Sequence, residues 1–243
     1  MKKPKKLIFI SGTGRSGTHL IGRSLSSHPE VIGRIEDSTT FPLITRLATT
    51  QDINNYLYNL LLRVRLKNKL TTILNNASSH VLEKSHPSLW LVDYLIKEIK
   101  NVFFIFVYRD VEPTVSSMLE HNGVLSWYSN LPQNKVNRFL GINKSNVKKF
   151  NDLSLEEKCA LRWLSHKNEI LRLKNKYPDK ILTIRYEEFM LAPDSFYAEV
   201  SQFLDITNSF SSEKFKTDSL DKWKEKLNKD QLDKIYKAVN PVL

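Results

Sequence analysis

The sequence is poor in cysteine, in long apolar runs and in glycine, and the first two scarcities each exclude a class of protein. Its 243 residues include one cysteine, Cys159, which excludes an intramolecular disulfide and a multi-cysteine metal cage. No apolar run approaches the roughly 18 residues of a membrane-spanning helix. The apolar run Leu7–Ile10 is also too short for the core of a signal peptide. We therefore predict a mature cytoplasmic protein without a membrane span.

Glycine is also scarce: the chain has seven glycines among 243 residues, which is less than half of the usual share of about 7%. Five of the seven lie in one N-terminal stretch, at Gly12, Gly14, Gly17, Gly22 and Gly33. Glycine adopts backbone conformations that other residues avoid. The cluster therefore marks the segment where an unusual backbone conformation is expected.

Positive charge is in excess, since 37 basic and 26 acidic residues give a formal net charge of +11. Such a charge favours an anionic partner: nucleic acid, anionic lipid or a phosphorylated small molecule. The lysines are spread along the chain, however, and the only basic run is Lys2–Lys6. A dedicated basic arm is not evident, so no nucleic-acid partner is predicted.

Three apolar runs bounded by turn residues are predicted to be buried strands: 7–11, 102–107 and 181–185. Segments with helical character alternate with them, at 18–27, 51–75, 89–99, 112–119, 156–175, 194–204 and 218–238. The alternation predicts an α/β fold of three layers, with a central parallel β-sheet flanked by helices, in a single domain over 1–243. Residues 121–151 are polar and weakly periodic, which predicts a long loop or lid.

The glycine cluster opens with a phosphate-binding pattern between the first strand and the first helix. Gly12 and Gly17 have the spacing of a Walker loop, but Thr18 and His19 follow in place of the lysine and the magnesium-binding hydroxyl. A cation is present inside the loop, as Arg15. The loop therefore suits a phosphate rather than a metal-bound triphosphate. This argues against one alternative function, a small-molecule kinase with a degenerate P-loop.

A second anion-binding element follows the strand predicted over 102–107. Arg109 stands at the carboxyl end of this strand, where open α/β sheets bind ligands, and Ser117 lies eight residues later. Arginine is suited to bidentate phosphate binding, and a serine hydroxyl can add a donor. The sequence therefore predicts two anion sites, each at the end of a strand.

With these elements the chain resembles the PAPS-dependent sulfotransferases, and its motifs are most similar to the tyrosylprotein or "type 3" branch. The R-S-G-T-T loop of that family is matched by residues 14–19, with His19 where a second threonine is more usual. The resemblance covers about 7–223 and is thin over 40–80 and 121–155. It implies a P-loop-like fold and a metal-independent, in-line transfer of a sulfuryl group. The donor would be 3′-phosphoadenosine 5′-phosphosulfate (PAPS) and the acceptor a hydroxyl.

The resemblance also assigns residues to the donor nucleotide. The loop would hold the 5′-phosphosulfate through Gly14, Arg15, Ser16, Gly17, Thr18 and His19. Arg109 and Ser117 would hold the 3′-phosphate, and Tyr186 would lie near the adenine. Lys222 would lie close to the nucleotide, although a basic helix face around Trp223 explains it equally well.

Catalysis needs a base for the acceptor's proton, and cations for the charge that develops on the transferred group and on the leaving phosphate. The resemblance implies Glu36 as the base and Arg15 and Lys84 as the cations. The base is left open at this point, because the alignment assumes no gaps. The other candidates are Asp37, His19, His86 and His121.

The acceptor is predicted only as a hydroxyl group, on a saccharide, a small molecule, a lipid or a peptide tyrosine. Trp127 and Tyr128 could stack against it or pack the lid. The tyrosylprotein branch is lumenal and disulfide-bonded in animals, whereas the single cysteine favours the cytoplasm here. The oligomeric state is left open. A non-enzymatic basic protein that binds anions is the remaining alternative.

Overall fold

The computed structural model describes residues 4–50, 56–207, 210 and 215–240. Residues 51–55 of the helix predicted over 51–75, and the start of the basic run at Lys2, lie outside them. Five parallel strands form one sheet in the described chain, in the order β2 (Val31–Ile35), β3 (His80–Lys84), β1 (Leu7–Gly12), β4 (Val102–Tyr108) and β5 (Ile181–Arg185).

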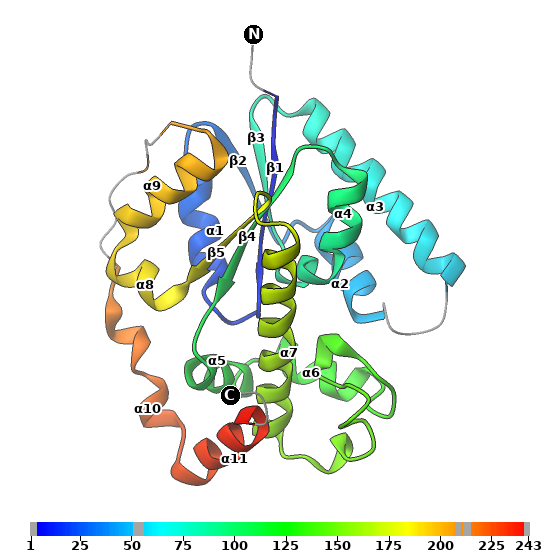
Figure 1. Cartoon of the computed structure of the whole chain (residues 1–243), viewed down its shortest axis with the longest axis vertical. Helices are drawn as coiled ribbons and strands as arrows, with labels where there is room; N and C mark the ends of the chain where they lie inside the picture. Colours follow the sequence, from blue (N-terminus) through cyan, green and yellow to red (C-terminus); the bar gives the residue numbers. More distant parts are fainter. Residues whose placement is uncertain (1–3, 51–55, 208–209, 211–214, 241–243) are drawn as a thin grey trace.

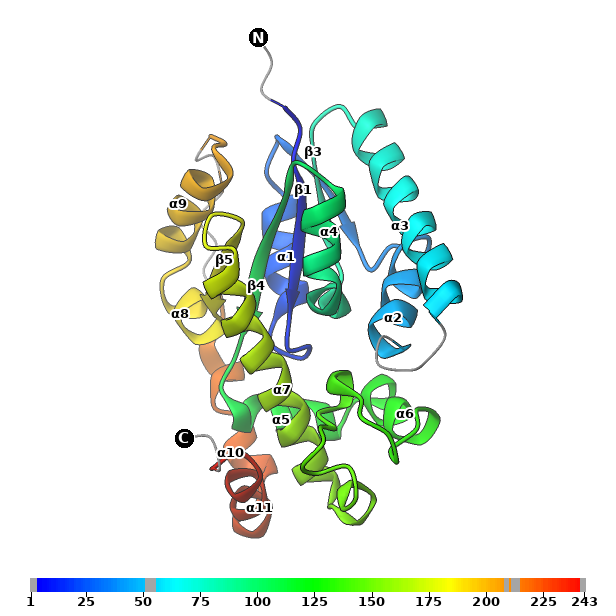
Figure 2. The same cartoon turned by 45° about the vertical axis from the view of Figure 1, so that its right-hand side comes forward.

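Helices cover both faces of this sheet (Figures 1 and 2). One face packs against α1 (Thr18–Ser26), α8 (Tyr186–Leu191) and α9 (Pro193–Leu204). The other packs against α2 (Phe41–Thr50), α3 (Tyr56–Asn76), α4 (Val92–Glu98) and α7 (Leu155–Lys176). Side chains alternate along β1, so that Ile8 and Ile10 face the first group while Leu7 and Phe9 face the second. The predicted three-layer α/β fold is confirmed.

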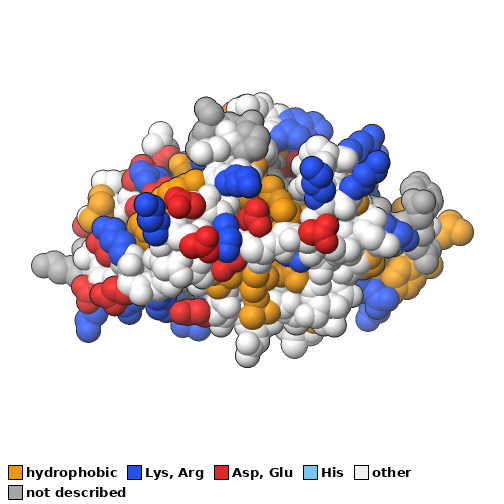
Figure 3. All heavy atoms as spheres, turned by 90° about the horizontal axis from the view of Figure 1, so that it is seen from below, with side chains coloured by type: hydrophobic (Ala, Val, Ile, Leu, Met, Phe, Trp, Pro, Cys, Tyr) orange, Lys and Arg blue, Asp and Glu red, His pale blue; other side chains and the backbone are white. Residues whose placement is uncertain are grey.

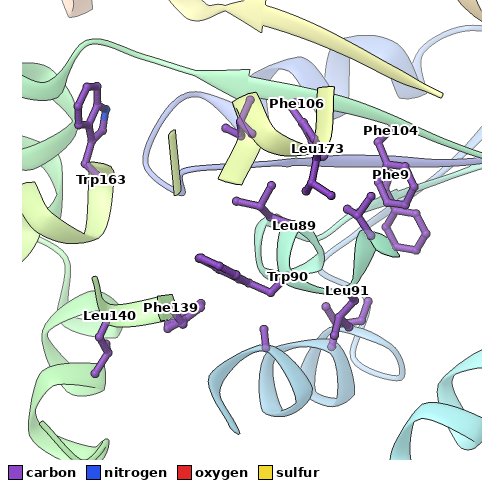
Figure 4. Close-up of a cluster of buried hydrophobic side chains, with 14 of the residues drawn as sticks. Phe9, Leu89, Trp90, Leu91, Phe104, Phe106, Phe139, Leu140, Trp163 and Leu173 are labelled. Atoms are coloured by element: carbon purple, nitrogen blue, oxygen red, sulfur yellow. The ribbon is translucent and has the colours of Figure 1, made fainter. Parts of the chain in front are cut away.

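The larger hydrophobic core lies on the α7 side of the sheet. Figure 4 shows aromatic side chains of the strands facing leucines of the helical segments, and Phe9 and Phe104 stack with ring centroids 5.3 Å apart. Leu89 and Leu173 are fully buried in the same cluster. Burial of each such side chain stabilises the fold by about 1.5–3 kcal/mol. The packing therefore holds β1 and β4 firmly in place.

Parallel pairing places the ends of neighbouring strands at one edge of the sheet. Gly12 at the end of β1 pairs with Val107 of β4, and Ile35 at the end of β2 pairs with Lys84 at the end of β3. The segments that follow these strands therefore begin side by side. Strands β2 and β3 lie on one side of β1 in the sheet, and β4 and β5 lie on the other side. The direction of the connections therefore reverses next to β1, and the carboxyl ends of the strands at such a switch point are where open α/β sheets bind ligands.

The segment 121–151, predicted as a loop, is partly helical. It contains α6 (Asn122–Asn130), whose first turn is capped by the His121 side chain and whose inner face buries Val124 and Tyr128. Two short 3-10 helices follow, Arg138–Leu140 and Phe150–Asp152. The polar composition hid this helix, because only two of its nine residues are buried.

Other helices differ from the prediction at their ends. The helix predicted over 89–99 begins as a 3-10 helix, His86–Leu91, and continues as α4. The one predicted over 218–238 is divided into a 3-10 helix (Thr217–Leu220), α10 (Trp223–Lys226) and α11 (Lys229–Val239), because Asn228 and Gln231 form a capping box that starts a new helix. The helix predicted over 112–119 is observed as α5 (Val111–Leu119), whereas α2 was not predicted.

Candidate functional site

A cavity of about 430 Å³ lies where the strands end. Both anion-binding elements contribute to its wall, as do the ends of β2 and β3. The predicted site residues that line it are Gly14, Arg15, Gly17, Thr18, His19, Glu36, Lys84, Arg109 and Ser117. Most of the candidate residues, taken from four separate parts of the sequence, are therefore brought together in one place.

The loop between β1 and α1 has the backbone that its glycines predicted. Gly14 and Gly17 have φ angles of 67° and 85°, and Arg15 between them has a φ of 62°. A non-glycine residue in this region is strained, and such strain is concentrated at functional sites. In the described chain no side chain caps α1 at Gly17, so backbone N–H groups of its first turn are available to an anion.

The hydroxyl groups of the loop are partly committed to the loop itself. Thr13 and Ser16 are fully buried and their hydroxyls hydrogen-bond to each other. Thr18 is also buried but lies on the cavity wall. Ser16 is not among the described residues that line the cavity. Its contact with the 5′-phosphosulfate therefore stays a prediction.

Arg15 joins the two anion-binding elements. Its Nε donates a hydrogen bond of 3.1 Å to Oγ of Ser117 on α5, although the two residues are 102 positions apart. Burial lowers the pKa of Arg15, against the charge of Glu36, which raises it. An arginine keeps its charge under such a shift. The guanidinium thus stands as a fixed cation between the loop and the strand-end element.

Glu36 lies directly after β2 and is also strained, with a φ of 49°. Its Oε1 accepts hydrogen bonds from Lys84 Nζ at 2.5 Å and from His19 Nε2 at 3.1 Å, and His86 Nδ1 lies 3.9 Å away. Burial would raise the pKa of Glu36, but the hydrogen bonds and charges of His19 and Lys84 outweigh it and lower this pKa to about 2. The carboxylate is therefore ionised across the physiological range.

Lys84 is a buried cation of the site, with 1% of its side chain exposed. Burial lowers the pKa of Lys84, and the hydrogen bond and charge of Glu36 act in the opposite direction. A buried ion pair of this kind is costly to break, because removing one partner leaves an uncompensated charge. Lys84 is therefore not a solvated surface lysine.

Arg109 has one hydrogen-bonding group without a partner. Its Nη2 donates to the Ser219 carbonyl at 2.8 Å, and its guanidinium lies 4.8 Å from the ring centre of Tyr186. Nε of Arg109 is buried and has no hydrogen-bond partner in the described chain, with Glu187 at 3.7 Å. An unsatisfied buried donor is expensive. An anionic ligand at this point would satisfy it.

Tyr186 and Lys222 lie outside the main cavity. The Tyr186 ring covers Gly17, since a Cβ on this glycine would come within 2.1 Å of it. Lys222 lines a second cavity of about 170 Å³, together with Trp223. Arg109 and Ser117 line both cavities, so the two spaces adjoin. No contact shown for the described residues decides whether Lys222 reaches a nucleotide.

Several residues of the cavity wall were not predicted from the sequence, among them Phe41 and Arg162. Phe41 starts the unpredicted helix α2, and Arg162 lies on α7 with its side chain fully buried. Arg162 Nη1 donates to the Thr13 carbonyl at 3.3 Å, and its guanidinium lies over the rings of Trp127 and Phe139. An arginine between Leu161 and Trp163 in an otherwise apolar helix stretch was the available signal.

Two of the candidate bases have other partners. Asp37 pairs with Arg34 at 2.6 Å and accepts a hydrogen bond from the backbone N–H of Thr39. The ring of His121 accepts a hydrogen bond from the Val124 N–H as the cap of α6. Glu36, His19 and His86 remain, and they form one contiguous cluster.

Behind the site, Glu83 on β3 is fully buried and accepts a hydrogen bond of 2.8 Å from Thr40. Burial raises the pKa of Glu83 to about 7, against this hydrogen bond and the charge of Arg34. A raised pKa means that the folded state holds the proton more tightly than the unfolded chain. The stability that Glu83 contributes is therefore complete below about pH 4 and is lost as the pH rises through 7.

We expect Glu83→Gln to be more stable than the parent by about 2 kcal/mol at pH 8.5, because glutamine stays neutral in the same space. The difference should shrink as the pH is lowered to 5. Thermal unfolding at a series of pH values measures it. Glu188→Gln, at an exposed carboxylate, is the matched control and should show no such trend. A difference that is independent of pH would contradict the assignment.

Comparison with known proteins gives the class. A model of the sulfotransferase family matches residues 7–211. The chain therefore belongs to the sulfotransferase family. The predicted resemblance to the PAPS-dependent sulfotransferases, and to their tyrosylprotein branch in particular, is confirmed.

Among curated proteins, the chain is 22% identical over 220 residues to the protein-tyrosine sulfotransferase of Drosophila melanogaster, a match that covers 82% of this chain and 38% of that protein. It is 22% identical over 222 residues to protein-tyrosine sulfotransferase 1 of Danio rerio, which covers 84% and 54%. The chain thus spans about half or less of the length of these relatives.

Solved structures support the fold. The sulfotransferase domain of the Synechococcus olefin synthase has a TM-score of 0.57 at 14% identity, covering 98% of this chain and 95% of that one. A sulfotransferase from Alicyclobacillus acidocaldarius has a TM-score of 0.54 at 14% identity, covering 99% and 97%. At this identity the likeness concerns the fold alone.

The predicted cytoplasmic location is wrong. The curated relatives are animal protein-tyrosine sulfotransferases, which belong to the branch that is lumenal in animals. The prediction failed because a single cysteine is compatible with a reducing compartment without requiring one. Within the described ranges, no helix is both long enough and apolar enough to cross a bilayer. In the same ranges, no three His, Cys, Asp or Glu side chains are grouped as metal ligands.

Proposed function

We propose that this sulfotransferase uses PAPS as its sulfuryl donor and releases 3′-phosphoadenosine 5′-phosphate (PAP). The observation that carries the proposal is the hydrogen bond between Arg15 and Ser117, which joins two anion-binding elements in one cavity. The loop suits the 5′-phosphosulfate, and Arg109 with its unpaired Nε suits the 3′-phosphate. A nucleotide with phosphates at both positions fits this pair of sites.

The charged residues of the cavity support an in-line transfer. Arg15 and Lys84 supply positive charge for the transferred group and the leaving phosphate oxygen. The Glu36 carboxylate supplies a negative charge at the acceptor end, 2.5 Å from Lys84 Nζ. Fixed donors already hold the leaving group, so we propose that the reaction needs no metal.

The cavity also favours one kind of acceptor. Besides the charged groups, its wall carries Phe41, Trp127 and Val124, and the His86 ring lies 5.7 Å from that of Trp127. Aromatic walls favour an aromatic ring next to the hydroxyl. We therefore propose a phenol as the acceptor, with a peptide tyrosine as the leading case because the curated relatives are named for it.

The other functions considered have less support. A kinase would need the lysine and hydroxyl that Thr18 and His19 replace. A basic binding protein would need a face of one sign, whereas Figure 3 shows acidic and basic side chains interspersed on the face seen from below.

Transfer of ³⁵S from labelled PAPS to a tyrosine-containing peptide and to 2-naphthol tests the proposal. Arg15→Ala and Glu36→Gln should abolish most of the transfer, because each removes a charged group of the cavity. If both variants transferred like the parent, the assignment of the site would be wrong even though the family is established.

Arg109→Ala should weaken PAP binding about 30-fold, since a charge-assisted contact to the 3′-phosphate is lost. Binding of AMP, which lacks this phosphate, should hardly change. Isothermal titration of both nucleotides against parent and variant measures the two effects. Parent protein that bound PAP no tighter than AMP would contradict the 3′-phosphate site.

A further inference from the structure

His19 is the residue at which the loop departs from the sulfotransferase pattern, and the structure gives it a specific neighbour. It is the second residue of α1 and lines the cavity, with 46% of its side chain exposed. Its Nε2 lies 3.1 Å from Oε1 of Glu36. The ring thus bridges the carboxylate and the open space of the cavity.

Glu36 itself is poorly suited to remove a proton. Its Oε1 accepts from both Lys84 and His19, and the resulting pKa of about 2 makes the carboxylate a very weak base. A general base is most effective when its pKa lies near the working pH. Histidine is the side chain used most often for this step, and a carboxylate hydrogen-bonded to one ring nitrogen fixes which nitrogen carries the proton.

We propose that His19 is the base that touches the acceptor, with Glu36 as the carboxylate that orients and balances it. An ionised Glu36 can only accept a hydrogen bond, so neutral His19 carries its proton on Nε2. The lone pair of Nδ1 is then free, and no hydrogen bond to Nδ1 is found among the described residues. The inference rests on the sulfuryl transfer proposed above.

The lone pair of Nδ1 takes the proton of the acceptor hydroxyl, while the acceptor oxygen forms a bond to sulfur. The bond between sulfur and the bridging phosphate oxygen breaks, and its electron pair stays on the 5′-phosphate of PAP. His19 becomes an imidazolium next to the Glu36 carboxylate, and later releases its proton to water.

The other charged groups around His19 do not replace this arrangement. The cations that line the cavity oppose a second positive charge there, namely Arg15, Lys84, Arg109 and Arg162. Burial lowers the pKa of His86 far below its usual range, and burial also lowers that of His121. Glu36 is therefore the one carboxylate among the described cavity residues that can stabilise the imidazolium.

Replacing His19 with threonine, the more usual residue at this position, tests the proposal. We expect about a 100-fold lower kcat for ³⁵S transfer to 2-naphthol, with PAP affinity unchanged. The parent should lose activity in acid, because a base that already holds a proton cannot take the proton of the acceptor. The variant should lack this acid limb, and His121→Asn should retain it.

Three results would overturn the proposal. One is His19→Thr with the activity of the parent, and another is a large loss of PAP affinity in this variant, which would make His19 a donor-binding residue. The third is a parent profile without an acid limb. Failure of the proposed function itself gives a different result, because the parent would then neither bind PAP nor transfer sulfate.

A second measurement needs no acceptor. ¹⁵N NMR of the imidazole rings, assigned with His19→Thr, reports the tautomer in the resting protein at pH 8. We expect the proton of His19 on Nε2, and a shift away from this tautomer in Glu36→Gln. A proton on Nδ1 in the parent would contradict the proposal, whatever the activity assays show.

Discussion

Replacing Lys84 with methionine is expected to lower kcat for sulfuryl transfer about 10³-fold, the largest loss among the cavity side chains. Lys84 is 1% exposed, so its charge acts where water cannot screen it. Methionine has a similar length and keeps the packing against Gly22, whose Cβ position lies 3.1 Å from Lys84 Cγ. The substitution therefore removes the charge with little change of shape.

The measurement is single-turnover ³⁵S transfer at saturating PAPS, which separates the chemical step from donor binding. Lys97→Met, at an exposed position on α4, is the matched control and should behave like the parent. The melting temperature of Lys84→Met should fall, because the Glu36 carboxylate loses its buried partner, so the rates of variant and parent are compared well below both melting temperatures. A rate within tenfold of the parent's would show that Lys84 has no role in the transfer, on the scale of about 1.4 kcal/mol per factor of ten.

Local sequence was enough to predict the structural features that depend only on residues close together in the chain. The apolar run 102–107 became β4, and the spacing of Gly12, Gly14 and Gly17 became the strained loop before α1. Both follow from rules that act over a few residues, namely strand periodicity and the conformations open to glycine. The positions of the two anion-binding elements followed as well, because each is attached to the end of a strand.

Burial of charged residues was not predictable in the same way. Lys84 is buried because β3 lies between β2 and β1, and this order is set by contacts 48 and more residues apart. Arg162 reaches the loop from α7, 149 residues from Thr13. The residues next to Lys84 or Arg162 in the sequence do not indicate which distant segment will bury the charged side chain. The helix α6 was missed for the related reason that its inner face is short.

The contact between Glu36 and His19 was only partly predictable from the sequence. The resemblance gave Glu36 a role and placed His19 in the loop, but it did not place their side chains together. The 3.1 Å contact arises because β2 pairs with β3 and ends beside the first turn of α1. The chemistry of the pair therefore depends on tertiary structure.

Replacing Gly17 with alanine is expected to weaken PAP binding more than about 100-fold, because the loop must move by an ångström or more. Gly17 has a φ of 85°, which alanine adopts only at a cost, and the new Cβ would lie 2.1 Å from the Tyr186 ring. The ring cannot move freely, since the Arg109 guanidinium lies 4.8 Å from its centre. We also expect the free energy of unfolding to fall by about 3 kcal/mol.

Two further variants divide this effect into its causes. In Gly17→Ala/Tyr186→Ala the collision is removed and only the backbone strain remains, so part of the stability should return. Gly22→Ala adds the same methyl group where φ is helical and the nearest atoms are side-chain atoms of Lys84 and Ile35, 3.1–3.3 Å away. It should change stability much less. Chemical denaturation and titration with PAP measure both quantities. If Gly17→Ala bound PAP as the parent does, the loop would not be the site of the 5′-phosphate.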